Sequence, residues 1–375
     1  MKILHLGDLH IGKRVNDFSM LEDQEFVLNQ ATSLIKKEKI KALLISGDVF
    51  DKPVASIEAI NLFCKFLEDV NKLNTKIYII PGNHDNSERL NYLSSFAQKS
   101  DIYFAKTFEG EIQKFDLDNE IVIYLMPYLY PAIIKKYYPD IEFKSYNDAI
   151  KKVVDDIKLD NKKTNILVAH QFVTGKNQKI IHSESEQKQA GLIDEINCDI
   201  FKKFDYTALG HLHCAQSAGY KNIRYSGSIL KYSLSEINQK KVFTILDIKD
   251  KKITLGFKDI EFLRDIKCYR GKLNEFLNKD FYSKIKTDDY IYFILEDEGI
   301  IDAKKELSTI YPNIMLLEFD NDFTRNLNNI EFKNKKENLS SEELFFDFFE
   351  TQTNGKINDF QKKLIIDCFN NKETI

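Results

Sequence analysis

Cysteine is scarce in this sequence, which has five among 375 residues and no Cys-x-x-Cys pair. An odd, dispersed set of cysteines argues against a disulfide framework and is typical of reduced thiols in a cytoplasm. Long hydrophobic runs are also missing, since no apolar stretch approaches the ~18 residues of a membrane span. The N-terminal residues MKILHLGDLHIG lack the apolar core of a signal peptide. We therefore expect a cytoplasmic protein that does not enter a membrane.

An excess of positive charge is likewise absent, because 54 Lys and Arg residues face 58 Asp and Glu residues, a net charge of -4. This excludes a globally basic nucleic-acid-binding protein, so any DNA binding must come from local patches, metal ions or a partner. No Walker motif occurs, and any ATP dependence must therefore also come from a partner. In contrast, a hydrophobic fraction of 43% supports a sizeable core, and 375 residues are enough for two or three domains.

Strands and helices alternate through the first ninety or so residues. Strand-like segments at Lys2–Leu6, Ala42–Ser46 and Lys76–Ile80 enclose helical patterns at Met20–Lys37 and Ser56–Leu73, the second with a capping serine. This β-α-β-α-β order is typical of a layered α/β domain.

The pattern changes further along the chain. Strands with a turn at Asp118-Asn119 are expected between Gly110 and Met126, then a helix over Asn147–Ile157. Strands follow at Tyr220–Tyr225, Lys241–Ile248 and Ile253–Lys258. Beyond about residue 260, Lys272–Asn278, Tyr290–Leu295, Ala303–Tyr311 and Ile314–Phe319 predict a small α-β-α-β module. We predict domains at 1–260 and 265–320, with a polar linker and C-terminal helices over 326–375.

Five short motifs follow hydrophobic, strand-like runs, and they carry most of the chemistry. They are Gly7-Asp8-Leu9-His10, Gly47-Asp48, Gly82-Asn83-His84-Asp85, Ala169-His170 and Gly210-His211-Leu212-His213. Open α/β folds bind their ligands where strands emerge at the sheet edge. The oxygen and imidazole donors suit Mn, Fe or Zn, and seven such donors are too many for one ion but suit two ions that share a carboxylate.

Each motif taken alone has an ordinary alternative. Asp8 and His10 would pass as a surface pair, Asp48 as a helix or turn cap, and Asn83-His84-Asp85 as a plain turn. The combination is different, because five of the seven histidines lie in these motifs. Of the other two, we expect His5, within the first strand, to be a packed core residue and His182 to lie on the surface.

With these motifs the sequence resembles the calcineurin-like metallophosphoesterase superfamily and, within it, the bacterial SbcD family of nuclease subunits. The resemblance is carried by LHLGDLHIGKRVNDFSMLEDQ, SGDVFDKPVAS, PGNHDNSERL, ALGHLH and YSGSILKYSLSE. It covers nearly the whole chain and thins beyond residue 260. It implies an α/β fold class: a layered α-β-β-α metallophosphoesterase core with a small α+β capping domain and C-terminal helices.

The resemblance also implies two divalent metal ions, usually Mn²⁺. One would be held by Asp8, His10, Asp48 and His213, and the other by Asp48, Asn83, His170 and His211, with Asp48 bridging. His84 would not ligate a metal; it would face the scissile phosphate and stabilise charge or protonate the leaving oxygen. Two cations neutralise a phosphodiester and acidify a bridging water for in-line attack, which fits this assignment.

Neighbouring residues have weaker assignments. Asp85 either orients the His84 ring or caps a turn, with the two about equally supported. Lys13 and Arg14 are candidate contacts to DNA phosphates, and a solvated surface pair is the alternative. Asp51 and Lys52 lie near the second motif, but the sequence gives them no role.

The C-terminal region predicts a partner. Asn326–Ser340 is polar and linker-like, and Ser341–Glu350 and Asp359–Phe369 are expected to form two amphipathic helices. Leu344, Phe345, Phe348 and Phe349 need burial, and a partner groove is favoured over the core. By resemblance that partner is an SbcC-type coiled-coil ATPase. The resemblance further implies a homodimer through helices in the first half, although an apolar face such as Phe63–Leu67 would also suit the core.

The leading hypothesis is a manganese-dependent DNA nuclease subunit of a repair complex. By resemblance it would be a 3′ to 5′ exonuclease on duplex ends and an endonuclease on hairpins or single strands. A phosphatase or phosphodiesterase of another substrate class is the second hypothesis. Asp51-Lys52-Pro53 argues against a protein phosphatase, which has Asp-Arg-Gly there. An inactive scaffold is the third, and it is disfavoured because all seven donors and His84 are present.

Overall fold

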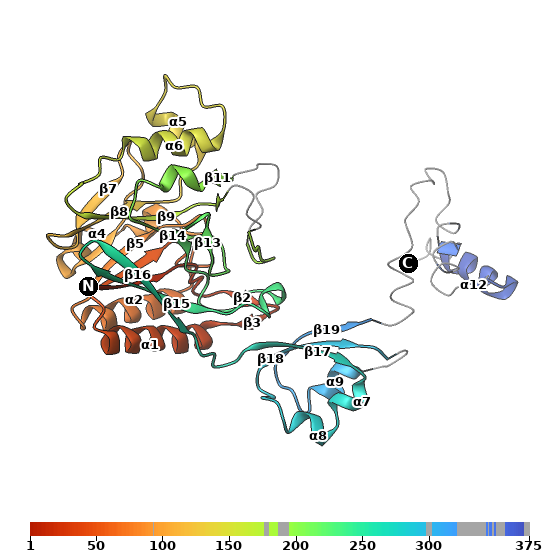
Figure 1. The fold of residues 1–375 in the computed structure, drawn as a ribbon. Helices are drawn as coiled ribbons and strands as arrows, with labels where there is room; N and C mark the ends of the chain where they lie inside the picture. Colours follow the sequence, from red (N-terminus) through yellow and green to blue (C-terminus); the bar gives the residue numbers. More distant parts are fainter. Residues whose placement is uncertain are drawn as a thin grey trace. The chain divides into compact units, whose positions relative to one another are not determined.

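Two six-stranded sheets form the larger part of the molecule, as a computed structural model of the chain shows (Figure 1). Their facing sides are joined by a core of strand residues, including Leu44, Tyr78, Ile123 and Val168. The residues that the structure describes are 1–92, 94–175, 180–186, 195–297, 302–320, 343, 345–346, 349 and 357–370.

The first sheet has four parallel strands, β1, β4, β5 and β6, and two antiparallel strands, β15 and β16, at one edge. Its central strands are almost entirely apolar and buried, as expected for parallel strands covered on both faces. In spatial order the strands are β16 (Lys252–Asp259), β15 (Val242–Lys249), β1 (Lys2–Leu6), β4 (Ala42–Ser46), β5 (Lys76–Ile80) and β6 (Ile102–Phe104).

The second sheet has the same number of strands and a parallel centre of β8, β9, β12 and β14. Its outer strands, β13 and β7, pair antiparallel. In spatial order the strands are β13 (Ser217–Ala218), β14 (Tyr220–Tyr225), β12 (Tyr206–Gly210), β9 (Thr164–His170), β8 (Ile121–Met126) and β7 (Gln113–Asp116).

Helices cover the outer faces of both sheets, which completes four layers (Figure 1). On the first sheet, α1 (Leu21–Glu38) and α2 (Ile57–Asn71) bury Val27, Phe63 and Val70 against strand residues. On the second sheet, α6 (Tyr146–Asp156) buries Val153, and α5 (Pro131–Tyr137) precedes it. The predicted α-β-β-α layering is confirmed.

Local signals account for several boundaries. The Ser56 side chain accepts a hydrogen bond from Ala59 N at 3.2 Å, so the predicted serine cap of α2 is confirmed. Asp118 Oδ1 accepts from the Glu120 and Ile121 amides and closes the predicted turn between β7 and β8. Short elements without strong periodicity were not predicted: the β2–β3 (Arg14–Val15, Phe18–Ser19) and β10–β11 (Val173–Thr174, Ile196–Asn197) pairs, α3 (Ser87–Leu90), α4 (Ser94–Ala97) and the 3-10 turns η1 (Gln98–Ser100), η2 (Cys198–Phe201) and η3 (Leu234–Glu236).

The chain downstream of β16 forms a three-stranded sheet of order β17-β18-β19, from β17 (Ile266–Gly271), β18 (Tyr290–Leu295) and β19 (Ile314–Phe319). Strands β18 and β19 match the prediction, whereas β17 was missed because its exposed and buried residues follow no clean pattern. The helices are shorter than predicted. Instead of Lys272–Asn278 and Ala303–Tyr311, the structure has α7 (Leu273–Phe276), α8 (Lys279–Tyr282) and α9 (Ala303–Leu307).

The chain divides into two compact units. The first consists of Met1–Cys268, Lys286–Tyr292 and Tyr311–Leu316, and the second of Tyr269–Ile285, Phe293–Ile310 and Leu317–Ile375. The domain limits predicted at 260, 265, 320 and 326 remain predictions. The linker at Asn326–Ser340 and most of the helix predicted over Ser341–Glu350 lie outside the described residues, whereas α12 (Asp359–Asn370) corresponds to the second predicted helix. None of the helices in the described part of the chain has the length and apolar character needed to cross a bilayer.

Candidate metal centre

The five predicted motifs meet at the carboxyl-terminal edges of the two sheets. The first sheet supplies Asp8 and His10 after β1, Asp48 after β4, and Asn83 and His84 after β5. The second sheet supplies His170 at the end of β9 and His211 and His213 after β12, where Gly210 pairs with His170. Backbone hydrogen bonds join the first two motifs, from Asp8 N to Gly47 O at 3.1 Å and from His10 N to Asp48 O at 2.9 Å.

Four of the donor residues adopt left-handed backbone conformations. The φ angles are 51° for Asp8, 44° for His10, 49° for Asp48 and 104° for His211. Positive φ is uncommon outside glycine and costs about 1–3 kcal/mol at sparsely populated angles. The chain turns sharply at these points, and Asp8 and His10, two residues apart after β1, reach the same group of donors.

The glycines before the donors permit the close approach of the motifs. Gly47 has a φ of 92°, and a Cβ there would collide with the His170 ring. A Cβ on Gly210 would collide with the Ser46 carbonyl. A side chain at either position would push the two sheets' donors apart, which explains why glycine precedes Asp48 and His211.

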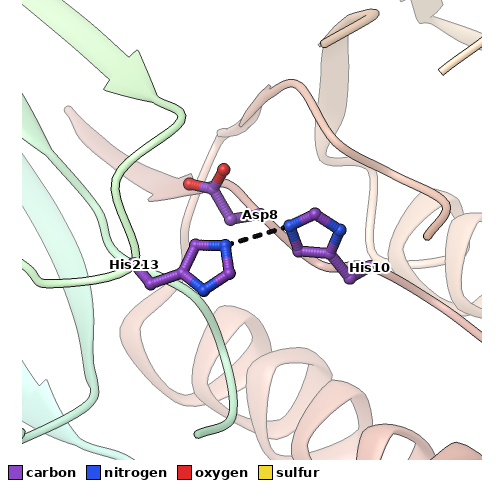
Figure 2. Close-up of side chains that lie close together, drawn as sticks. All are labelled: Asp8, His10 and His213. Carbon is purple, nitrogen blue, oxygen red and sulfur yellow. Dashed lines mark hydrogen bonds between the residues drawn. The ribbon is translucent and has the colours of Figure 1, made fainter. Parts of the chain in front are cut away.

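Asp8, His10 and His213 form one group of donors, and Figure 2 shows their side chains converging from both sheets. His10 Nε2 and His213 Nε2 are 3.1 Å apart. Among the described residues, Asp8 Oδ2 and His10 Nδ1 are buried polar atoms without a hydrogen-bond partner. The His10 Nδ1 atom lies 3.9 Å from Asp51 Oδ1, whereas Nε2 of the same ring faces His213. An orphaned carboxylate oxygen is costly in a dry interior, and a cation bound by this group would relieve that cost at Asp8.

Asn83, His170 and His211 form a second group. Asn83 Oδ1 lies 2.9 Å from His170 Nε2 and 3.2 Å from His211 Nδ1. Asp48 stands between the two groups, because its Oδ2 atom is 3.6 Å from His10 Nε2 and 3.4 Å from His170 Nε2. The structure therefore brings all seven predicted donors together, with Asp48 in the shared position.

His84 borders the same space. Its Nε2 atom lies 4.0 Å from Asp48 Oδ2, and its Nδ1 atom lies 3.0 Å from the Asp51 carbonyl oxygen. The Nδ1–H group donates to that carbonyl, which fixes the ring orientation and leaves Nε2 directed toward the donors. Sequence reasoning gave Asp51 no role, because a backbone carbonyl leaves no trace in the residue type.

Asp85 and the two candidate DNA-contact residues have local partners. The Asp85 carboxylate accepts from the backbone amides of Gly82, Val49 and Phe50 at 2.9, 3.0 and 2.9 Å. These contacts match the turn-cap alternative for Asp85. Lys13 Nζ lies 2.7 Å from Asp51 Oδ1, and the exposed Arg14 donates to the Asp17 carbonyl.

The centre is electrostatically unbalanced without cations. Burial raises the pKa of Asp8 to about 7. Burial opposes ionisation of Asp48 too, but the facing His170 holds the pKa of Asp48 well below its usual range. Burial likewise lowers the pKa of His10, and that of His211 to about 3. Burial opposes protonation of His170, but the charge of Asp48 outweighs it and raises the pKa of His170 to about 9. A divalent cation would displace the protons on His170 and Asp8, and the resulting neutral imidazole and carboxylate are the forms that bind a metal, so the residues present fit such an ion.

The remaining histidines agree with their predictions. His5 is fully buried, and its ring nitrogens lie 3.1 Å from Tyr206 Oη and Ser46 Oγ. His182 is exposed, with 48% of its side chain accessible. Neither side chain contributes to the donor groups.

Glu236 is a site residue that sequence reasoning missed. It is fully buried, its Oε1 atom is 3.2 Å from His213 Nδ1, and its Oε2 atom is 2.6 Å from Lys241 Nζ. Ser185 Oγ is 2.7 Å from the same His213 nitrogen. With Nδ1–H donated to these acceptors, the lone pair on His213 Nε2 faces His10. Glu236 ends the stretch YSGSILKYSLSE, but only the folded chain shows which histidine it contacts.

Replacing Glu236 with glutamine is expected to lower the affinity for Mn²⁺ by about 10- to 100-fold, the usual cost of losing a partner behind a ligand histidine. The amide keeps the size of the side chain but loses the charge that orients His213 and pairs with Lys241. Isothermal titration of Mn²⁺ into the purified chain measures this. Glu38→Gln, which disrupts the partly exposed Lys2–Glu38 ion pair, is the matched control. Equal affinity in both variants would exclude an orienting role.

Comparisons with known proteins agree with this geometry. A family described as "Calcineurin-like phosphoesterase" matches residues 1–215, and one described as "Type 5 capsule protein repressor C-terminal domain" matches residues 262–353. The chain is 30% identical over 373 residues to the SbcD subunit of the nuclease SbcCD from Staphylococcus epidermidis, and the match covers 97% of each chain.

Two solved structures with weaker likeness each cover about 70% of the chain. A dimetal phosphatase from Danio rerio is 10% identical, with a TM-score of 0.42, and covers 70% of this chain and 98% of its own. GAP50 of Plasmodium, described as the anchor in the inner membrane complex, is 14% identical, with a TM-score of 0.41, and covers 71% of this chain and 90% of its own.

Proposed function

This chain belongs to the calcineurin-like phosphoesterases and, within them, to the SbcD family of nuclease subunits, and we propose that it is a metal-dependent DNA nuclease subunit of an SbcCD-type complex. The observation that carries the proposal is the convergence of seven oxygen and imidazole donors and His84 at one edge of the two sheets. A phosphodiester is an anion with a poor leaving group, and such a site is suited to it.

We assign two divalent cations, preferably Mn²⁺, to this centre. Asp48 would be shared, because its Oδ2 atom lies within 3.6 Å of nitrogens from both donor groups. When bound, the cations would offset the phosphate charge and make the attacking water more acidic. One cation would be held by Asp8, His10, Asp48 and His213, and the other by Asp48, Asn83, His170 and His211.

His84 acts on the leaving group in this proposal. The Asp51 carbonyl fixes its Nδ1–H group, so a protonated ring donates from Nε2 to the oxygen that leaves phosphorus. Asn83 supplies a neutral oxygen, which keeps the centre positive enough to attract the anionic substrate. By analogy with the family, the reaction would be 3′ to 5′ exonuclease cleavage of duplex ends and endonuclease cleavage of hairpins or single strands.

We propose an SbcC-type coiled-coil ATPase as partner, bound through the C-terminal helices. The described helix there, α12, exposes Phe360 by 76%, Leu364 by 56% and Ile366 by 40%. Exposed apolar side chains on one short helix suit a partner's groove. The cytoplasm is the location in which such a complex would meet DNA.

We also propose a homodimer of the nuclease subunit. The Phe63–Leu67 face of α2 is part of the core, since Phe63, Phe66 and Leu67 are buried. The dimer interface must therefore use side chains that are exposed to solvent in the single chain. Ile57 on α2 is 73% exposed, and Tyr92 and Phe96, near α4, are 84% and 68% exposed. Such exposed apolar side chains on neighbouring segments suit a second copy of the chain.

Tyr92→Glu is expected to raise the dissociation constant of the dimer at least about 30-fold, the effect of losing an aromatic anchor worth ~2 kcal/mol. The new charge would be buried without a partner in the dimer, whereas it is solvated in the monomer. Light scattering over a concentration series measures the change. Phe257→Glu, at an exposed position of β16, is the control. A Tyr92→Glu protein with the wild-type dissociation constant would place the interface elsewhere.

The proposed function is tested by nucleotide release from an end-labelled linear duplex incubated with the purified chain and Mn²⁺. Chelator and His84→Ala are the controls. Release that both controls abolish would support the nuclease. Activity on a generic phosphodiester with no release from DNA would favour another phosphoesterase substrate or cleavage that needs the partner. Inactivity on both substrates would favour the scaffold hypothesis.

A further inference from the structure

Two tyrosines after β8 extend from the metal centre toward the surface. The Tyr128 ring centroid lies 6.1 Å from that of His170, with the rings inclined at 75°. The Tyr130 centroid lies 4.7 Å from that of Tyr128, inclined at 83°. Tyr130 is 40% exposed, so its ring is not part of the core. The three rings form a continuous series from a predicted metal ligand to solvent.

The backbone beneath these rings is fixed. Tyr128 N donates to the Pro81 carbonyl at 3.1 Å, which ties this segment to the turn that carries Asn83 and His84. Leu129, between the two tyrosines, is fully buried. Tyr130 is the N-cap of α5, and its carbonyl accepts from Ile133 N at 3.0 Å. Rings mounted on such a segment keep their distance from the site without a large entropy cost on binding.

The two candidate DNA-contact residues already have partners within the protein. Lys13 is paired with Asp51, and Arg14 is engaged by the Asp17 carbonyl. With a net charge of -4, the chain gains little from unspecific attraction to phosphates. Burial and the charge of Asp48 raise the pKa of Tyr130, so its ring is a neutral phenol at physiological pH. A neutral aromatic face supplies affinity that does not depend on charge.

We propose that Tyr130, supported edge to face by Tyr128, forms a stacking platform for the unpaired nucleobase next to the phosphate under hydrolysis. A base is joined to its phosphate through one sugar, so a strand at the donor groups places that base near these rings. Bases inside a duplex are covered by their neighbours, whereas a frayed or single-stranded base offers a free face. The platform therefore favours unpaired ends. This proposal rests on the proposed nuclease function.

Two chromogenic esters test the platform with the full-length chain and Mn²⁺. Thymidine 5′-p-nitrophenyl phosphate and methyl p-nitrophenyl phosphate release the same leaving group and differ in the nucleoside. The ratio of their kcat/KM values isolates the contribution of the nucleoside. Tyr130→Ala is expected to lower this ratio about tenfold, mainly through KM for the thymidine ester, because stacking on an aromatic ring is worth about 1–3 kcal/mol per base. Tyr130→Phe, which keeps the ring, should retain the ratio.

Tyr220→Ala is the matched control, since this tyrosine lies at the start of β14, the end of the strand opposite the site, and is 36% exposed. An unchanged ratio in Tyr130→Ala would overturn the platform while leaving the phosphodiesterase intact. An equal loss in Tyr130→Phe would also overturn it, because the hydroxyl and not the ring would then carry the effect. No hydrolysis of either ester by the wild-type chain would overturn the proposed function and the platform with it.

Discussion

Replacing Asp48 with alanine is expected to abolish Mn²⁺ binding at both positions and to lower nuclease activity by at least about 10³-fold, the effect of losing several kcal/mol of cation stabilisation. The reason is its central place, because Asp48 Oδ2 is within 3.6 Å of nitrogens from both donor groups. Asp48 Oδ1 also accepts from the His84 amide at 2.9 Å, so the substitution disturbs the turn that carries Asn83. Metal analysis of the dialysed protein and nucleotide release measure the two effects.

Asp116→Ala is the control for this experiment, because that carboxylate has 67% of its side chain exposed and, within the described part of the chain, forms an ion pair only with Lys163. It should bind two equivalents of Mn²⁺ with wild-type activity. Two bound ions in the Asp48→Ala protein would overturn the shared position of Asp48. A melting temperature close to that of wild type would show that the loss is local.

Replacing His84 with alanine is expected to leave Mn²⁺ binding nearly unchanged and to lower kcat by about 10²- to 10⁴-fold, the usual contribution of a general acid or base. His84 Nδ1 is engaged by the Asp51 carbonyl, and its Nε2 atom is 4.0 Å from Asp48 Oδ2, so the ring borders the donors without being needed to complete either group. Titration of Mn²⁺ and steady-state kinetics on one preparation separate binding from catalysis.

The exposed His182 provides the control substitution to alanine, with wild-type kinetics expected. A leaving group that needs no proton gives a second readout. On a p-nitrophenyl ester the His84→Ala defect should shrink, since p-nitrophenolate departs without protonation. A defect of equal size on DNA and on this ester would show that His84 acts in another way. Loss of one equivalent of Mn²⁺ would make His84 a ligand.

Much of the layered fold could be predicted from the sequence, because its central strands are short apolar runs and its long helices are amphipathic. Segments such as Ala42–Ser46 and Met20–Lys37 correspond closely to β4 and α1. Elements stabilised mainly by tertiary contacts could not be predicted. Strand β17 follows no clean alternation, and the segment after α9 leaves the helix although Tyr311 is buried. Hydrophobic periodicity shows which face of an element is apolar, and in a segment of five or six mixed residues it contains too few positions to distinguish a helix from a strand.

The donors of the centre were predictable for a different reason. Asp8, His10 and Asp48 lie within a few residues of a strand end, so the position of the strand end largely fixes the position of the side chain. Glu236 has no such relation to His213, which it contacts across 23 residues. The role proposed for Tyr130 could not be predicted either, because a tyrosine before a helix has no residue-type signature of a site. Both assignments depend on tertiary packing, which no local sequence pattern encodes.

The division of the donors between two sheets has a consequence for how the protein folds. Asp8, Asp48 and Asn83 come from the first sheet, and His170, His211 and His213 from the second. Neither sheet alone presents the complete set, so under the proposed assignment cation affinity would arise only once the sheets have docked. Bound ions would then slow unfolding, because they hold the docked sheets together. They would not accelerate folding of either sheet, because neither binds them before docking.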